Sequence, residues 1–286
     1  MKMKNLVLVC AALSVTACQS DTKNLEKKLD DLTTYVKQNC SGGGRGANNQ
    51  PQRPSRPEPD KAKTYAISVD GDPFEGPGDA KVTIVKAYDY ACPYCQKVRP
   101  TMDELRKKYG NELRVVFKQF VVHPQVATAP ALAFCAAAKQ GKAIEMDALL
   151  WDKGFTEHNF DKDASGEGAG PGGKCWESPA GCPVVLGFAQ QLGIDQNKFK
   201  TDMKECQALI QKDMRDLQAL GVGATPSFFI NGRFVSGAMP IDVFTALIDE
   251  ELKKANDRIQ SGTPAAQYYQ QWVMDKGLKT LEAPKQ

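Results

Sequence analysis

The residues best suited to do chemistry in this sequence are two cysteines separated by two residues, in the run Cys92-Pro93-Tyr94-Cys95. Two thiols at this spacing in the first turn of a helix can close a small disulfide and open it again. Cys92 would face the unpaired N–H groups of the helix start, which stabilise a thiolate and lower the pKa of the thiol. Cys95, one turn further on, is placed to attack a mixed disulfide on Cys92 and release the partner. We therefore expect both cysteines to be catalytic.

A zinc knuckle is the main alternative for this motif, and it needs two more cysteine or histidine ligands at matching spacing. The chain has nine cysteines but only two histidines. No second CxxC or paired histidine is present, and His123 and His158 each stand alone in the sequence. We therefore expect no metal, no other cofactor and no catalytic histidine.

The segments around the two cysteines indicate an α/β unit. A run of β-branched residues, 82–85, leads into the motif, and the following residues fit a helix that Pro100 should kink. Strand, helix, strand and helix alternate from there, which predicts a sheet that delivers the cysteines to the start of a helix. Beyond the first strand, the expected elements are a helix over 96–109, a strand over 113–122, and helices over 129–140 and 143–151.

Two segments resemble the bacterial DsbA family of the thioredoxin superfamily. Residues 89–95, Asp-Tyr-Ala-Cys-Pro-Tyr-Cys, are similar to the family's active-site segment, and residues 223–232, Gly-Ala-Thr-Pro-Ser-Phe-Phe-Ile-Asn-Gly, are similar to its cis-proline strand and turn. The resemblance covers about 65–260 and implies a thioredoxin fold with an inserted helical subdomain over about 124–220. It also implies that Pro226 is cis and packs against the disulfide, while Thr225 offers its backbone to a substrate. Taken alone, the second segment reads as a strand followed by a type I′ hairpin, with a cis bond only an exceptional possibility.

The chain departs from this family at positions that tune the redox reaction. Lys86 stands six residues before the first cysteine, where thioredoxin-like proteins usually have a buried acid. Either its charge acts on the cysteines, or it lies at a strand edge with its ammonium in water. Pro93 and Tyr94 are also expected to tune the pair, and they lack the histidine of the most oxidising members. We expect oxidation of substrate dithiols; the alternatives are a reductase or isomerase, or a non-enzymatic lipoprotein that binds copper or a protein partner through the dithiol.

The remaining cysteines suggest a structural role. Cys175 and Cys182 flank a short stretch in a glycine-rich insertion and are expected to form a disulfide in an oxidising compartment. Cys135 and Cys206 lie on helical segments and either pair across the helical subdomain, as in some relatives, or remain buried free thiols.

The first residues resemble a bacterial lipoprotein signal, with lysines, a short apolar run and small residues before Cys18. The resemblance implies cleavage and acylation at Cys18, and Gln19 after it implies the outer rather than the inner membrane, facing the periplasm. Leucines and a valine over 25–36 then form about two heptads, so 22–40 is either a dimer helix or a solvated stalk, and Cys40 could link two chains. The expected organisation is a signal peptide over 1–17, an anchor and short amphipathic helix over 18–40, a Gly/Pro-rich linker over 41–63, the DsbA-like domain over 64–260 and a helical extension over 261–286.

The net charge of the chain and its expected compartment restrict the classes of molecule that it can bind. Thirty-seven lysines and arginines against 34 acids leave a net charge of +3 without a basic run, so we expect no nucleic acid. The expected partners are exported proteins with thiols or disulfides, a membrane redox partner of unknown identity, and a membrane that the lipid anchor reaches.

Overall fold

The computed structural model describes residues 58–165 and 173–281. The expected signal peptide, the lipidated Cys18, the helix over 22–40, Cys40 and most of the linker lie outside the described residues. Within the described ranges, no helix is long and apolar enough to cross a membrane.

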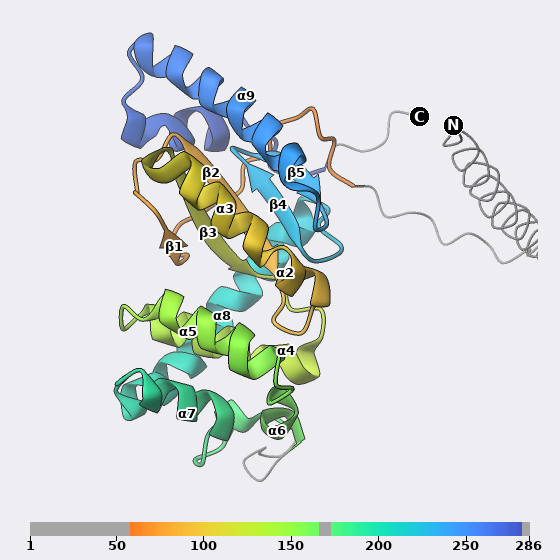
Figure 1. Cartoon of the computed structure of the whole chain (residues 1–286), viewed down its shortest axis with the longest axis vertical. Helices are drawn as coiled ribbons and strands as arrows, with labels where there is room; N and C mark the ends of the chain where they lie inside the picture. The colour runs from red at the N-terminus through yellow and green to blue at the C-terminus, as the bar shows by residue number, and fades with distance from the viewer. Residues whose placement is uncertain (1–57, 166–172, 282–286) are drawn as a thin grey trace, which may run out of the picture. The chain divides into compact units, whose positions relative to one another are not determined.

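A five-stranded sheet, in the order β1-β3-β2-β4-β5, forms the centre of the described chain (Figure 1). Strands β2 and β3 run parallel and the other neighbours are antiparallel. All seven residues of β2 are buried, because a central strand is covered on both faces and on both edges. The strands are β1 (Phe74–Glu75), β2 (Val82–Tyr88), β3 (Leu113–Gln119), β4 (Ser227–Ile230) and β5 (Arg233–Ser236).

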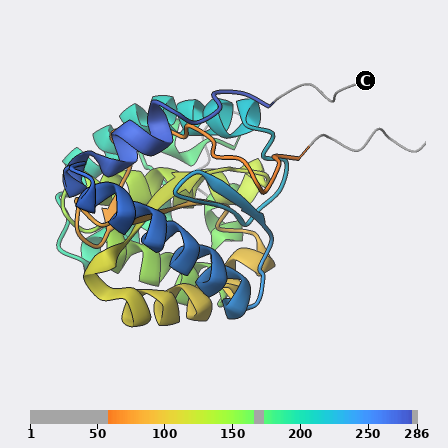
Figure 2. The ribbon, with the colours of Figure 1, turned by 90° about the horizontal axis from the view of Figure 1, so that it is seen from above.

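Helices cover both faces of this sheet, and the α/β class that the sequence predicts is confirmed. Figure 2 shows α3 (Arg99–Tyr109) and α9 (Ile241–Gln260) on one side and α8 (Gln196–Ala219) on the other. The expected helix over 96–109 is divided into α2 (Pro93–Lys97) and α3. Pro100 has no N–H to donate to the turn before it, and the break falls two residues earlier, at Val98.

The chain between β3 and β4 forms a helical subdomain below the sheet in Figure 1. Its helices are α4 (Pro124–Ala138), α5 (Ala143–Leu149), α6 (Phe160–Ser165), α7 (Pro183–Gln191) and α8, with a π-helical turn over Leu150–Phe155. A disulfide between Cys135 and Cys206 links α4 to α8, with their Cα atoms 6.1 Å apart. A second disulfide, Cys175–Cys182, closes the short loop that precedes α7.

Two expected elements end earlier than the sequence pattern predicts. The strand expected over 113–122 stops at Gln119, because the N–H groups of Val122 and His123 donate to the Asp89 carboxylate and turn the chain toward α4. Up to Leu281, where the described residues end, the C-terminal extension has a short 3₁₀ turn over Ala265–Gln267 and a π-helical turn over Tyr269–Met274 in place of a continuous helix. Tyr269 is buried and its hydroxyl donates to Ile67 O, so this segment packs on the domain.

Candidate active site

Cys92 lies at the point where the central strand gives way to a helix. The buried Asp89 carboxylate, just past the end of β2, accepts an N–H from Ala91 at 2.6 Å as well as those of Val122 and His123. This hydrogen bonding fixes the turn between strand and helix. Cys92 is the N-cap residue of α2, with φ −90° and ψ 116°, and no side chain caps the helix. Its sulfur therefore lies beside the backbone N–H groups of Tyr94 and Cys95 in the first turn.

The surroundings of Cys92 stabilise its thiolate. The neighbouring Cys95 thiol is the strongest stabilising partner, and the Thr225 side chain and the backbone N–H groups of Tyr94 and Cys95 add to it. Together they lower the pKa of Cys92 to about 5, against the opposing effect of burial. When protonated, the Cys92 thiol instead donates to Thr225 O at 3.3 Å. Cys92 is therefore ionised at neutral pH in the reduced protein.

Cys95 has the opposite character. Its side chain is fully buried, and burial followed by the hydrogen bond with Cys92 raises its pKa well above the usual range of a thiol. The Asp89 backbone N–H and the charge of Lys86 act against this rise. In the described part of the chain, Cys92 and Cys95 are the cysteines outside disulfides. The two sulfurs thus form an asymmetric pair of one reactive thiolate and one protected thiol.

The second segment singled out in the sequence meets the first at this site. The Thr225–Pro226 peptide bond is cis, and Thr225 O lies against the Cys92 sulfur. Asn231 and Gly232 both have positive φ, 43° and 82°, as a type I′ turn between β4 and β5 requires. The Thr225 hydroxyl oxygen is buried without a hydrogen-bond partner among the described residues, so it is free to donate to the thiolate.

Lys86 lies on the central strand β2, so its interpretation as a strand-edge residue with its ammonium in water is wrong. The side chain is 4% exposed, and its Nζ lies 4.4 Å from the centre of the Tyr88 ring. Burial lowers the pKa of Lys86, while the charges of Asp147 and Cys95 favour the ammonium. Lys86 and Cys95 therefore act on each other's ionisation.

Asp147 is the residue near this site that the sequence analysis missed. It lies on α5 and accepts hydrogen bonds from the Tyr90 hydroxyl at 2.7 Å and from Trp151 Nε1 at 3.2 Å. The Tyr90 and Tyr88 hydroxyls are 3.1 Å apart and share a further hydrogen bond. Only the fold brings Asp147 to β2, and no local pattern marks it in the sequence.

The other predicted residues lie apart from the sulfurs or at the surface. Tyr94 is 62% exposed, beside the reactive thiol, and Pro93 is the first residue of α2. His123 is half exposed, with Nδ1 3.3 Å from the Asp89 carboxylate. Residues 58–165 and 173–281 contain no cluster of three or more side chains suited to hold a metal ion.

The comparisons with known proteins agree with this geometry. A family model described as thioredoxin matches residues 68–250. The described fold is similar to α-DsbA1 of Wolbachia pipientis, with a TM-score of 0.52 and 17% identity over 68% of this chain and 96% of that one. It is also similar to oxidised BdbD of Bacillus subtilis, with a TM-score of 0.50 and 24% identity over 69% of this chain and 100% of that one.

A curated relative from Herminiimonas arsenicoxydans, named Na(+)/H(+) antiporter NhaA, is 31% identical over 185 residues. The match covers 62% of this chain but only 25% of that relative, so the chain spans about a quarter of its length. The site described above contains the dithiol and the cis-proline segment on a sheet of thioredoxin type. The chain therefore belongs to the thioredoxin family, and its fold is that of the DsbA proteins.

Proposed function

We propose that this protein oxidises the dithiols of exported proteins through Cys92 and Cys95. The observation that carries the proposal is the position of Cys92 at the N-cap of α2, beside the Thr225 side chain and the Cys95 thiol, because these surroundings lower the pKa of its thiol to about 5. A stabilised thiolate favours the reduced form of the enzyme over its disulfide, which has no such charge. An enzyme whose reduced form is stabilised gives its disulfide to substrates readily, so it acts as an oxidant.

The reaction begins with the Cys92–Cys95 disulfide. A substrate thiolate attacks Cys92 Sγ, because Cys92 is the more accessible of the two cysteines, 5% exposed, while Cys95 is fully buried. A bond forms between the substrate sulfur and Cys92, and Cys95 leaves with the electron pair as a thiolate. A second substrate thiolate then attacks the first substrate sulfur, and Cys92 leaves as the stabilised thiolate. The substrate ends with a disulfide and the enzyme with a dithiol.

Thr225 and Pro226 support substrate binding in this proposal. Thr225 O lies 3.3 Å from Cys92 Sγ, so a substrate segment that approaches the sulfur also passes this backbone. The ring of Tyr94, two residues after Cys92 in α2, is exposed and provides apolar surface. These contacts would hold a peptide next to the sulfur without selecting a particular sequence, which suits an enzyme with many substrates.

We also propose that the protein works in the bacterial envelope, held to a membrane by acyl chains on Cys18. The signal-like residues 1–17 support this location, and so do the two disulfides of the helical subdomain, since such bonds persist in oxidising compartments. A membrane partner would reoxidise the dithiol after each turnover.

Trapping of intermediates tests the roles of the two cysteines. In Cys95→Ser the resolving thiol is absent, so mixed disulfides between Cys92 and envelope proteins should accumulate on non-reducing gels. Cys92→Ser serves as the matched control and should give none. Adducts on Cys92→Ser alone would reverse the roles, and adducts on neither variant would contradict disulfide exchange.

The redox potential tests the direction of exchange. We expect a potential above about −200 mV in glutathione buffers, on the oxidising side of the roughly −270 mV typical of thioredoxin. A potential close to that of thioredoxin would indicate a reductase instead.

A further inference from the structure

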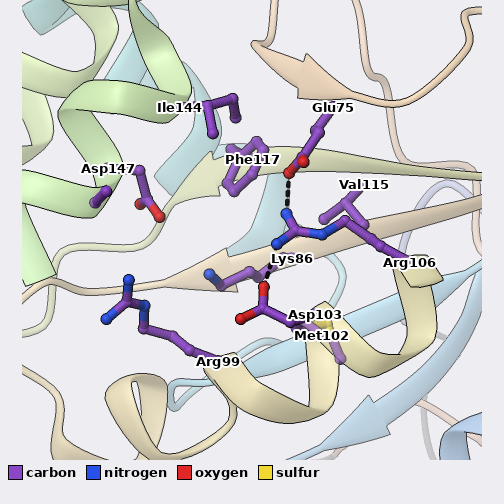
Figure 3. A pocket seen from close by; sticks show the side chains of 11 residues that line it. Glu75, Lys86, Arg99, Met102, Asp103, Arg106, Val115, Phe117, Ile144 and Asp147 are labelled. Atoms are coloured by element: carbon purple, nitrogen blue, oxygen red, sulfur yellow. Dashed lines mark hydrogen bonds and ion pairs between the residues drawn. The ribbon is translucent and has the colours of Figure 1, made fainter.

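A polar cavity of about 210 Å³ lies between the sheet, α3 and helix α5 of the helical subdomain (Figure 3). Lys86 extends into it from β2, and Asp147 faces it from α5 on the other side. Phe117 on β3 forms part of its apolar wall. The cavity therefore joins a charged residue of the sheet to a charged residue of the inserted subdomain.

Most of the charged groups around this cavity are already paired. Arg106 forms ion pairs with Glu75 and Asp103. Arg99 pairs with Asp152 at 2.7 Å, on the rim. No residue in the described part of the chain gives Lys86 Nζ a hydrogen-bonded or ion-paired partner; its contacts are the rings of Tyr88 and Phe117. The charged and titratable groups that face Lys86 from the neighbouring elements are Glu75, Tyr88, Cys95, Arg99, Asp103, Arg106 and Asp147.

The carboxylate of Asp147 is held firmly although it makes no ion pair in the described structure. Gln119 Nε2 donates to the Tyr88 hydroxyl at 2.5 Å, so Tyr88 donates to Tyr90 and Tyr90 donates to Asp147. Trp151 adds a second donor from the same subdomain. These hydrogen bonds hold the Asp147 carboxylate in place opposite the Lys86 amine.

We infer that Asp147 is a positioning residue for disulfide exchange, which keeps Lys86 charged so that the ammonium can stabilise the Cys95 thiolate. The inference rests on the proposed function and deepens it, since it assigns to the inserted subdomain a part in the chemistry of the sheet. Asp147 does not touch the sulfur and acts through Lys86.

The electrostatics support this arrangement. Burial lowers the pKa of Lys86 and so favours the neutral amine, and the charge of Asp147 is the largest effect that opposes it. Among the charged side chains around Cys95, Lys86 is the one that favours the thiolate. Thioredoxin-like proteins usually have an acid at the position of Lys86. In this chain the charge nearest to Cys95 is therefore positive instead of negative, and the acid lies further away, at Asp147.

The step that Lys86 would assist is the one in which Cys95 is a thiolate. When a thiolate attacks Cys92, the Cys92–Cys95 bond breaks and Cys95 takes the electron pair, which the ammonium stabilises before a proton from water or Lys86 neutralises the thiolate. In reverse, the Cys95 thiol gives up its proton, its sulfur bonds to Cys92, and the partner bound to Cys92 leaves as a thiolate. Both directions pass through the same charged state.

A double-mutant cycle in the full chain tests the inference. Glutathione is attached to Cys92, and the rate at which Cys95 expels it is measured from pH 5 to 9. Lys86→Met should slow expulsion at pH 7 about tenfold, which corresponds to a midpoint about one pH unit higher. Asp147→Asn keeps an oxygen for Tyr90 and should slow expulsion about threefold or more. Asp152→Asn, which removes a nearby exposed carboxylate, should change the rate less than about twofold.

Two results of this cycle decide the inference: whether Asp147→Asn slows or speeds the expulsion of glutathione, and whether its effect depends on Lys86. A carboxylate that acted directly on Cys95 would disfavour its thiolate, so Asp147→Asn would speed expulsion, and that outcome overturns the inference. In the Lys86→Met background, Asp147→Asn should have no slowing effect; equal slowing in both backgrounds would show a merely structural role and overturns it as well. A wild-type protein that never expels glutathione would refute the proposed function itself, and the inference with it.

Discussion

Replacing Thr225 with valine should weaken the thiolate of Cys92 without changing the shape of the site. Valine has the size of threonine but cannot donate a hydrogen bond. The Thr225 hydroxyl is buried, free of other partners in the described structure, and one of the groups that lower the pKa of Cys92. Its removal should therefore raise the pKa of Cys92 and destabilise the reduced protein relative to the disulfide.

The size of the effect follows from the energy of one hydrogen bond. A bond to a charged group contributes about 1.5–3 kcal/mol, and 1.36 kcal/mol corresponds to about one pKa unit. Because water screens charges near the surface that Cys92 must reach, we take the lower end of this range. The pKa should rise from about 5 to about 6, and the potential should become more negative by about 30 mV.

The rate of alkylation by iodoacetamide as a function of pH reports the pKa of Cys92, and equilibrium with glutathione reports the potential. Thr225→Ser is the matched control, because it keeps the hydroxyl and loses only a methyl group. It should stay close to the wild type in both measurements. Equal values for the valine variant and the wild type would show that the hydroxyl does not stabilise the thiolate.

Three further predictions concern stability and location. Burial raises the pKa of Asp163, which accepts the first N–H groups of α7, from 3.8 to about 6, so its carboxyl is harder to ionise in the folded protein than in the unfolded chain. Wild-type stability should therefore fall by about 2 kcal/mol as the pH rises from 4 to 6; Asp163→Asn should remove most of that slope in urea titrations, and an unchanged slope would contradict the prediction. Cys135→Ala removes the disulfide that spans 71 residues and should lower the free energy of unfolding by about 4 kcal/mol. Cys175→Ala removes the disulfide that spans 7 residues and should lower it by about 2.5 kcal/mol. A lower urea midpoint for Cys175→Ala than for Cys135→Ala would refute this order. Cys18→Ala should release the protein from membranes, and membrane fractionation after a salt wash checks it.

Several parts of the molecule could be predicted from the sequence because their causes are local. The β-branched run before Cys92 forms a buried strand, and the spacing of the two cysteines places both in one helical turn. Asn231 and Gly232 adopt the positive φ angles that a two-residue hairpin turn needs. In each case a short stretch of chain contains both the residue types and the geometry that they require.

The depth of Lys86 was decided by tertiary structure alone. Sequence spacing marks the residue as unusual, but whether a lysine on a strand reaches water depends on how many strands lie beyond it. Here β3 and β4 pair with β2 on its two sides, so the ammonium is buried. A different strand order would have left it at an edge with an ordinary pKa.

The position of the acid that faces Lys86 across the cavity was also decided by tertiary structure alone. Asp147 lies on a helix of the inserted subdomain, and its contact with Tyr90 joins residues 57 positions apart in the chain. The alanine- and leucine-containing sequence of that helix favours a helix, but it does not show what the helix packs against. The sequence therefore determined which thiols react, because the reactivity of Cys92 depends on its own helical turn. Only the packing of the subdomain on the sheet determined which charges surround the second thiol, because electrostatic effects depend on distance in space.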